Sequence, residues 1–317
     1  MKGPLAIIAG RSNPALASAA AATANVGVAS CELMNHADSE IGIEIRDNVR
    51  GHDVFVIQST SSPANDHLME LLIILDALKR ASANRVTAVL PYFGYARQDR
   101  KNRPRQPITA KLVADLITAA GANRILTMDL HAGQIMGFFN LPVDNLYARP
   151  VFLKYLQENF GDGDAVTIVS PDAGGVARAR AYAKRLDAGI AIIDKRRAVA
   201  NEVAEMNVVG DAKGKVAIII DDMVDTGGTL VKAAEALLAN GATQVVACCT
   251  HAVLSRDAIA KLRGSNVSRV IVSDTIAHPN FPEDDERFVR LSVASIIGEA
   301  IRRIHEESSV SSLFEIE

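Results

Sequence analysis

Cysteine is scarce in this sequence, and the marks of export or membrane insertion are missing. The three cysteines, Cys31, Cys248 and Cys249, include an adjacent pair and no CxxC spacing, so neither a disulfide framework nor a zinc site is predicted. The opening "MKGPLAIIAGRSNP" has too short an apolar run for a signal peptide, and the longest apolar stretch, around "LMELLIILDAL", is interrupted by charge. We therefore expect a protein of the reducing cytoplasm with no membrane partner.

A strong charge imbalance and low-complexity segments are also absent. The formal net charge of -3 at pH 7 gives no global attraction to nucleic acid, which is therefore not an expected partner. No long Gly/Ser linker interrupts the chain. Its 317 residues, 49% hydrophobic and 22% charged, can bury a sizeable core and suffice for about two domains.

Short apolar runs alternate with helical patterns along the whole chain, which is typical of parallel sheets built from strand-helix-strand units. In the first half, the strand candidates are "LAIIAG", "VFVIQST", "VTAVLPY" and "RILTMDLH". In the second half, strands are predicted at 166–170, 190–193, 216–220, 245–249 and 269–273. Polar residues such as Asp172, Lys195 and Asp221 closely follow these strands, and ligands of open α/β sheets bind beyond the carboxyl ends of strands. We expect the functional site there.

The two halves resemble one another at an offset of 120 residues. The segment "TAKLVADLITAAGANRILTMDLHA" (109–132) aligns with "TLVKAAEALLANGATQVVACCTHA" (229–252), and both contain a helical pattern, a glycine, an apolar run and a histidine in the same order. Common αβ packing and an alanine-rich composition could produce part of this match. The shared order nevertheless favours a duplicated α/β domain.

The most informative stretch is "AIIIDDMVDTGGTLVKAAEAL" (217–237), in which an apolar run leads into Asp221, Asp222 and Asp225, then two glycines and a helical pattern. Carboxylates can accept hydrogen bonds from sugar hydroxyls, and glycines allow backbone N–H groups to approach a phosphate at a helix N-terminus. A phosphorylated sugar is therefore the predicted ligand. The alternative is an Asp-rich turn in which Thr229 or a neighbour caps the helix.

The longer stretch "IIIDDMVDTGGTL" resembles the phosphoribosyl pyrophosphate loop of type I phosphoribosyltransferases. Four further motifs, "PYFGYARQDRKNRPRQPITAK" (91–111), "DLHAGQIMGFF" (129–139), "VSPDAGGVARAR" (169–180) and "AIIDKRR" (191–197), together resemble the ribose-phosphate pyrophosphokinase family. The resemblance covers essentially the whole chain. It implies transfer of the pyrophosphoryl group of magnesium ATP to the anomeric hydroxyl of ribose 5-phosphate, with release of AMP.

The resemblance also implies two tandem type I phosphoribosyltransferase-like domains with parallel sheets. The first, residues 1–146 completed by 289–317, is expected to bind ATP. The second, residues 147–288, is expected to bind ribose 5-phosphate, with the active site between the two.

Individual residues acquire roles by the same resemblance. Phosphoryl transfer requires positioning and neutralisation of developing charge. Lys195 and Arg197 are implied to stabilise the transition state, Arg197 also to contact ribose 5-phosphate, and His131 and Asp172 to contact magnesium. ATP is implied to be held by His36, Asp38, Ser39, Glu40, Arg97 and Gln98, and ribose 5-phosphate by Asp221, Asp222, Asp225, Thr226, Gly227, Gly228 and Thr229.

Several of these residues also have a purely structural interpretation. A KRR triplet taken alone is typical of a solvated face, and a single histidine after a strand is more often a hydrogen-bonded structural residue. Asp172 could be a turn residue ahead of a glycine pair. The later residues of "RQDRKNRPR" are interpreted as an exposed basic loop.

Two segments depart from the family pattern. The adenine-binding loop, usually "FSDGE", reads "HADSE", so His36 replaces a base-stacking phenylalanine and Ser39 replaces a glycine. After "KRR", the usual proline and arginine are replaced in "AVAN" (198–201). Nucleotide choice and loop closure are therefore the properties in which we expect this chain to differ from its relatives.

Two other classes of function stay open. A catalytically silent member that binds nucleotide and regulates a partner would predict damage to "DKRR", "DLH" or "DDMVDTGGT", all of which are intact. A purine or pyrimidine phosphoribosyltransferase would not explain "GYARQD". The resemblance further implies a homo-oligomer, a hexamer built from dimers, with phosphate and ADP as effectors at a site between subunits. The residues that match this effector site are Arg50, Ser82, Ser309 and Ser311.

Overall fold

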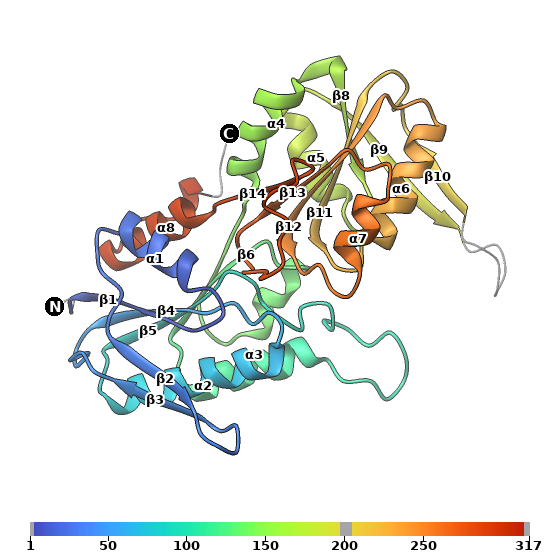
Figure 1. Cartoon of the computed structure of the whole chain (residues 1–317). Helices are drawn as coiled ribbons and strands as arrows, with labels where there is room; N and C mark the ends of the chain where they lie inside the picture. The colour runs from blue at the N-terminus through green and yellow to red at the C-terminus, as the bar shows by residue number, and fades with distance from the viewer. Residues whose placement is uncertain (1–2, 197–204, 314–317) are drawn as a thin grey trace. The chain divides into compact units, whose positions relative to one another are not determined.

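The computed structural model describes residues 3–196 and 205–313, and the chain divides into two compact units. The first contains residues 3–147, 275–277 and 292–313. The second contains residues 148–196, 205–274 and 278–291. None of the helices formed by the described residues has the length and apolar character needed to cross a bilayer. Figure 1 gives the element labels used below.

The first unit is built on a five-stranded parallel sheet with the order β1-β4-β5-β6-β7. Its strands are β1 (Leu5–Ala9), β4 (Asp53–Ile57), β5 (Arg85–Leu90), β6 (Arg124–Met128) and β7 (Val143–Leu146). A separate antiparallel hairpin is formed by β2 (Cys31–Asn35) and β3 (Ile41–Ile45). The helical elements are α1 (Pro14–Thr23), α2 (Ala64–Arg80), α3 (Thr109–Ala120), α8 (Ala294–Glu306), η1 (Gly133–Phe138) and η3 (Ser311–Leu313).

Helices cover both faces of this sheet, with α2 and α3 on one face and α1 and α8 on the other (Figure 1). Side chains of a strand alternate between faces, so Ile8, Val54 and Leu90 share one buried cluster with residues of α2 and α3. On the opposite face α1 and α8 approach closely at Gly298, where a Cβ atom would lie 2.5 Å from the carbonyl oxygen of Ala20.

A buried carboxylate attaches the C-terminal helix to the sheet of the first unit. Asp53, at the start of β4, accepts hydrogen bonds from Arg85 Nε at 2.7 Å and Arg85 Nη2 at 2.5 Å. His305 Nδ1 of α8 lies 2.9 Å from Asp53 Oδ2, and Arg85 Nη2 also donates to the Ile304 carbonyl oxygen at 3.1 Å. Residues near the end of the chain therefore complete the unit that begins it.

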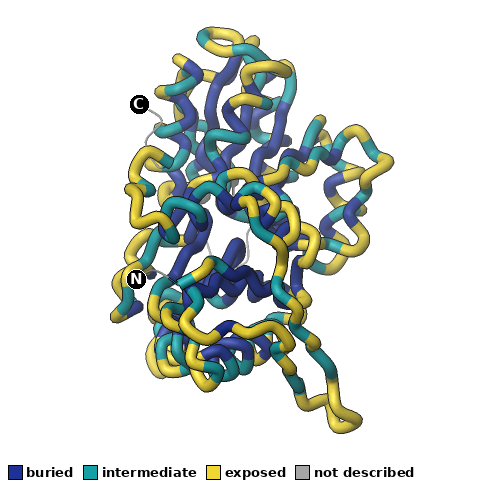
Figure 2. The backbone as a smooth tube through the Cα atoms, turned by 90° about the vertical axis from the view of Figure 1, so that its left-hand side faces the viewer, coloured by how far each residue is buried: buried dark blue, intermediate teal, exposed yellow. Residues whose placement is uncertain are grey.

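The second unit contains a seven-stranded sheet in which only β10 runs antiparallel to its neighbour. In spatial order the strands are β10 (Glu205–Val209), β9 (Gly189–Arg196), β8 (Val166–Ser170), β11 (Val216–Val224), β12 (Gln244–Ala252), β13 (Arg269–Ser273) and β14 (Phe288–Leu291). The helical elements are α4 (Arg149–Phe160), η2 (Gly163–Ala165), α5 (Val176–Arg185), α6 (Gly228–Ala239) and α7 (Ala258–Arg263). The central strands are almost wholly buried, as the dark tube segments in Figure 2 show.

The strand predictions agree with the structure except at strand ends and in the tail. β8 and β13 have the predicted bounds, whereas β9 and β11 continue to Arg196 and Val224, so Lys195 and Asp221 lie inside strands rather than after them. The cause is continued pairing with β10 and β12. We expected residues 289–317 to complete the first domain, but residues 289–291 belong to β14, which pairs with β13 in the second unit.

The predicted internal repeat corresponds to the same helix, glycine and strand in each unit. Both α3 and α6 are followed by a glycine with positive φ, 122° at Gly121 and 87° at Gly241. The next strands are β6 and β12. The two aligned histidines differ, however, because His131 is exposed beyond β6 while His251 is buried within β12.

Candidate active site

Three neighbouring strands bring the predicted sugar and catalytic residues to one edge of the second unit. β9, β8 and β11 are adjacent and parallel, so their carboxyl ends meet at the same edge of the sheet. Lys195 lies near the end of β9, Asp172 follows β8, and Asp221 and Asp222 lie in the last part of β11. In this unit the predicted residues do gather at the carboxyl ends of strands.

Asp221, which is half-buried, and Asp222, which is buried, form a pair of carboxylates beside one guanidinium. Arg178 Nη1, from α5, lies 3.4 Å from Asp221 Oδ1 and 3.3 Å from Asp222 Oδ1. Asp221 Oδ1 also accepts a hydrogen bond from the Asp222 amide at 2.9 Å. Burial, followed by the charge of Asp222, raises the pKa of Asp221 to about 8, against the lowering effect of Arg178.

The turn after β11 is shaped for a close backbone approach. Gly227 is in the left-handed conformation with φ of 73°, and α6 begins at the next residue. The residue at the N-cap position of α6 is this glycine, which has no side chain to accept from the first-turn N–H groups. Asp225 is held by the Ser255 hydroxyl, and the Ser255 amide donates to the Asp225 carbonyl oxygen at 3.1 Å.

Asp172 is both exposed and locally anchored. Its Oδ1 accepts a hydrogen bond from the Gly175 amide at 3.0 Å, and its carbonyl oxygen accepts one from the Ser170 hydroxyl at 2.6 Å. The predicted turn role ahead of the glycine pair is thus real. It leaves the carboxylate at the surface, where it is accessible to a ligand.

Of the two predicted catalytic cations, Lys195 and Arg197, the structure describes only the first. Lys195 belongs to β9 and its backbone pairs with Met206 of β10. Arg197 and the altered "AVAN" segment (198–201) lie outside the described residues.

In the first unit, adjacent strands carry the predicted nucleotide and metal residues. Arg97 and Gln98 follow β5, and His131 follows β6; all three are exposed. Gln98 is fixed by two contacts to α3, because its Oε1 accepts from the Thr109 hydroxyl at 2.5 Å and its carbonyl oxygen accepts from the Ala110 amide at 3.2 Å.

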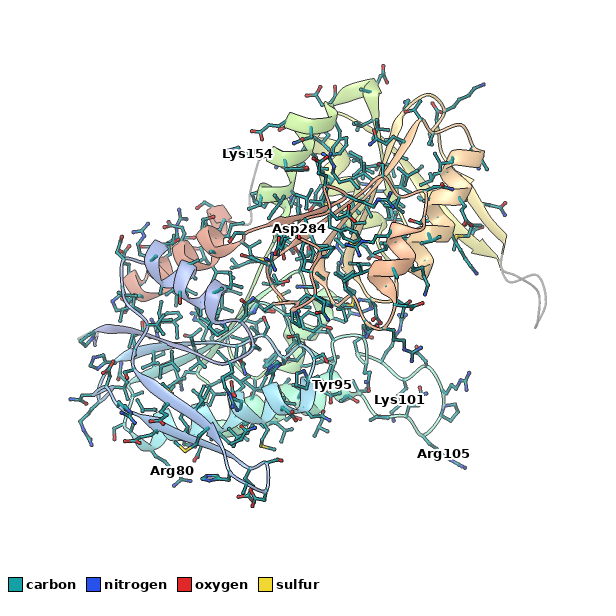
Figure 3. All side chains as sticks on the ribbon, viewed as in Figure 1. Arg80, Tyr95, Lys101, Arg105, Lys154 and Asp284 are labelled. Atoms are coloured by element: carbon teal, nitrogen blue, oxygen red, sulfur yellow. The ribbon has the colours of Figure 1, made fainter. Side chains whose placement is uncertain are left out.

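The loop between β5 and α3 extends away from the rest of the unit, with Lys101 and Arg105 along it and Tyr95 near its base (Figure 3). Residues 100–107 are all exposed. The loop is tied down before this stretch, where Asp99 accepts a hydrogen bond from Gln134 Nε2 at 3.1 Å. The prediction of an exposed basic loop is confirmed.

The other four predicted ATP residues form the tip of the β2–β3 hairpin. The turn is closed by the His36 amide donating to the Glu40 carbonyl oxygen at 2.8 Å, and the Glu40 amide donates to Asp38 Oδ1 at 3.1 Å. Ser39 has a φ of 75°, in the left-handed region that favours glycine. The turn therefore keeps a glycine-like backbone although glycine has been replaced. The His36 ring lies against Gly42. A Cβ atom added to this glycine would be 2.9 Å from the Nε2 atom of His36.

The predicted effector residues occur as two local pairs in the first unit. Arg50 Nη1 donates to the Ser82 hydroxyl at 3.2 Å, and the Ser311 amide donates to the Ser309 hydroxyl at 3.2 Å.

The described residues contain no cluster of three or more His, Cys, Asp or Glu side chains arranged to hold a metal. The donors nevertheless suit magnesium, which prefers oxygen ligands, keeps several waters and is commonly bound through one or two carboxylates plus substrate phosphates. The exposed carboxylate of Asp172 fits this pattern. The imidazole of His131 is a less favoured donor.

Two family models match the chain: the N-terminal domain of ribose phosphate pyrophosphokinase over residues 5–121, and the phosphoribosyl synthetase-associated domain over residues 195–315. The ribose-phosphate pyrophosphokinase of Granulibacter bethesdensis is 57% identical over 309 residues, which cover 98% of this chain and 99% of the relative. The chain belongs to the ribose-phosphate pyrophosphokinase family. The Brucella melitensis member is 55% identical over the same lengths. The crystal structure of phosphoribosylpyrophosphate synthetase from Mycobacterium smegmatis is 42% identical and superimposes with a TM-score of 0.90, covering 96% of this chain and 100% of that one.

These similarities confirm the predicted family, the fold of two phosphoribosyltransferase-like domains and the prediction of an enzyme. One residue of this pyrophosphokinase was missed from the sequence, namely Arg178. It lies within the motif "VSPDAGGVARAR", and the signal that could have found it is that a pair of adjacent, poorly hydrated carboxylates requires a cation nearby.

Proposed function

We propose that the enzyme transfers the pyrophosphoryl group of magnesium ATP to the anomeric hydroxyl of ribose 5-phosphate, forming 5-phosphoribosyl 1-pyrophosphate and AMP. In this reaction the anomeric oxygen forms a bond to the β-phosphorus of ATP, and the bond from that phosphorus to the oxygen bridging to the α-phosphate breaks. AMP leaves with the bridging oxygen, and the proton of the anomeric hydroxyl is released to solvent. Naming of the relatives as ribose-phosphate pyrophosphokinases supports this reaction.

The observation that carries the proposal is the N-terminus of α6, which directly follows the left-handed Gly227 and the carboxylates of β11. The first-turn N–H groups and the positive end of the helix dipole favour a phosphate. In the proposed complex Asp225, Thr226, Gly227, Gly228 and Thr229 surround the 5-phosphate. Asp221 and Asp222 accept hydrogen bonds from the ribose hydroxyls.

Other residues act on the transferred group. Lys195 and Arg197 neutralise the charge that develops on the phosphoryl oxygens, a contribution that is made only in the transition state. Asp172 and His131 hold magnesium, which when bound neutralises phosphate charge and orients the polyphosphate chain.

We also propose a division of labour between the domains. Residues 1–146 hold ATP through His36, Asp38, Ser39, Glu40, Arg97 and Gln98, and residues 147–288 hold ribose 5-phosphate. The free thiols of all three cysteines are consistent with a cytoplasmic location.

Assembly and regulation are further parts of the proposal. We expect a homo-oligomer, a hexamer built from dimers, with phosphate and ADP acting at Arg50, Ser82, Ser309 and Ser311. The Arg50–Ser82 pair supports this, because a guanidinium and a hydroxyl together suit a phosphate group.

The test is to supply ribose 5-phosphate and magnesium ATP and to identify the nucleotide released. AMP together with 5-phosphoribosyl 1-pyrophosphate is the expected result. Release of ADP, or nucleotide binding without turnover, would instead favour a different transfer or the silent regulatory protein. Consumption of 5-phosphoribosyl 1-pyrophosphate with a free purine or pyrimidine would indicate the base transferase.

A further inference from the structure

Arg178 lies at the contact between α5 and the end of β11, and its side chain is 21% exposed. The same atom, Nη1, makes both carboxylate contacts, at 3.4 Å to Asp221 and 3.3 Å to Asp222. Its neighbour Arg180, two residues along the same helix, is exposed. One turn of α5 thus carries one arginine directed at the carboxylates and one at the surface.

The carboxylate pair is unfavourable without a cation. Asp222 has a side chain only 5% exposed and Asp221 one that is 26% exposed, so both have lost most of their hydration. Side chains in such a place have few water partners to fix them, and the Arg178 guanidinium supplies a contact to one oxygen of each. Without this contact the two carboxyl groups can rotate away from the geometry that two sugar hydroxyls require.

We propose that Arg178 is a positioning residue for ribose 5-phosphate, which holds Asp221 and Asp222 together as a fixed pair of acceptors for the ribose hydroxyls. This inference rests on the proposed function. Arg178 does not touch the reacting atoms. It acts through the carboxylates, and its absence weakens binding of the sugar phosphate rather than the chemical step.

The position of Arg178 also links two parts of the site. α5 begins at Val176, directly after the turn that Asp172 closes through the Gly175 amide. The helix that follows Asp172 therefore carries, in its first turn, the cation that fixes the sugar carboxylates. A rigid α5 keeps Asp172 and the carboxylate pair in a constant relation.

The contacts of Arg178 predict which side chains can replace it. Because a single nitrogen contacts both carboxylates, the single ammonium of lysine can replace it, whereas glutamine retains a donor but no charge. Arg178→Lys should therefore bind ribose 5-phosphate within about threefold of the wild type, and Arg178→Gln about tenfold or more weakly. Arg180→Gln is the matched control and should bind normally.

Calorimetric titration of the full-length enzyme with ribose 5-phosphate, without nucleotide, measures this directly. Steady-state kinetics should then show a raised KM for ribose 5-phosphate in Arg178→Gln, with kcat and the KM for ATP close to wild type. Normal ribose 5-phosphate binding by Arg178→Gln overturns the inference. If Arg178→Gln does not fold, Arg178→Lys decides, since a folded lysine variant that binds about tenfold more weakly overturns it as well. Wild-type binding without release of AMP would refute the proposed reaction and leave this inference standing.

Discussion

Gly298 of α8 lies so close to Ala20 of α1 that a methyl group at its Cα would come within 2.5 Å of the Ala20 carbonyl oxygen. The same methyl group would lie 2.5 Å from Thr23 Cβ. Neither atom is the end of a flexible side chain, so the two helices would have to separate. The absence of a side chain at residue 298 thus sets the spacing of the α1–α8 pair.

Gly298→Ala should therefore destabilise the protein although alanine is the better helix former. Overpacking costs about 1–3 kcal/mol and can exceed the roughly 1 kcal/mol gained in helix propensity. The free energy of unfolding, measured with urea, should fall by about 1–2 kcal/mol. Gly27→Ala is the control, because a Cβ there meets nothing within 4 Å. An unchanged or higher unfolding free energy for Gly298→Ala would show that the helix pair can adjust.

The raised pKa of Asp221 predicts that part of the protein's stability is lost as pH rises. The folded state keeps the proton up to pH values near 8, whereas the unfolded chain releases it near the ordinary aspartate pKa of 3.8. The unfolded state therefore binds fewer protons between these values, and the free energy of unfolding falls across that window. Asp221→Asn removes this slope. The unfolding free energy of Asp221→Asn minus that of the wild type should be larger at pH 8 than at pH 5. The difference should be at least about 1 kcal/mol, because a tenfold change in proton affinity corresponds to about 1.4 kcal/mol.

Urea unfolding of both proteins at the two pH values, without ligands, provides the measurement. Asp284→Asn is the control for the substitution itself, because Asp284 is exposed on the second unit. An equal effect of Asp221→Asn at pH 5 and pH 8 would mean that Asp221 is ionised throughout.

Gly227→Ala tests the phosphate turn. The left-handed φ of 73° costs a non-glycine residue about 1 kcal/mol, and a Cβ would also lie 3.2 Å from Leu262 Cγ. Because the turn must shift, ribose 5-phosphate affinity should fall at least about tenfold. Gly241→Ala imposes similar strain, with φ of 87°, beyond the other end of α6. It should lower stability without lowering affinity. Similar affinities for the two variants would separate Gly227 from phosphate binding.

Lys195→Ala should lower kcat by at least about a hundredfold, or roughly 2.7 kcal/mol, with ribose 5-phosphate binding largely intact. The reason is that its charge is used only as the β-phosphorus is attacked, whereas the turn after β11 is a separate element. Lys184→Ala, on the exposed side of α5, is the control. Circular dichroism should show that the fold is retained. A near-normal kcat would identify Lys195 as a surface charge, and lost binding at preserved kcat would make it a substrate clamp.

The sequence was most informative where backbone pattern and chemistry coincide. The buried strands and the glycine-containing turn of "DTGGT" follow from apolar runs and from the φ that only glycine adopts easily. The ends of β9 and β11 were placed too early, because aspartate and lysine have low strand propensity while pairing with β10 and β12 overrides it.

Elements that depend on distant partners were not predictable in the same way. β14 is only four residues long and forms by pairing with β13 across an intervening loop, which no local pattern reveals. The hairpin β2–β3 was recognised only through its tip. The Arg178 contact depends on the direction in which this side chain of α5 points relative to β11, 43 residues away. Spacing in the sequence does not predict that direction.

The attachment of α8 to Asp53 has a consequence for the order in which the chain folds as it is made. Translation delivers the sheet of the first unit early, but Ile297, Ile301 and His305, which pack or pair against that unit, are made only after the segments of the second unit. The part of the sheet that α8 covers therefore lacks this helix while nearly the entire second unit is synthesised. The second unit is mostly one continuous segment and can close first. In this protein the half that is translated first is the half that is finished last.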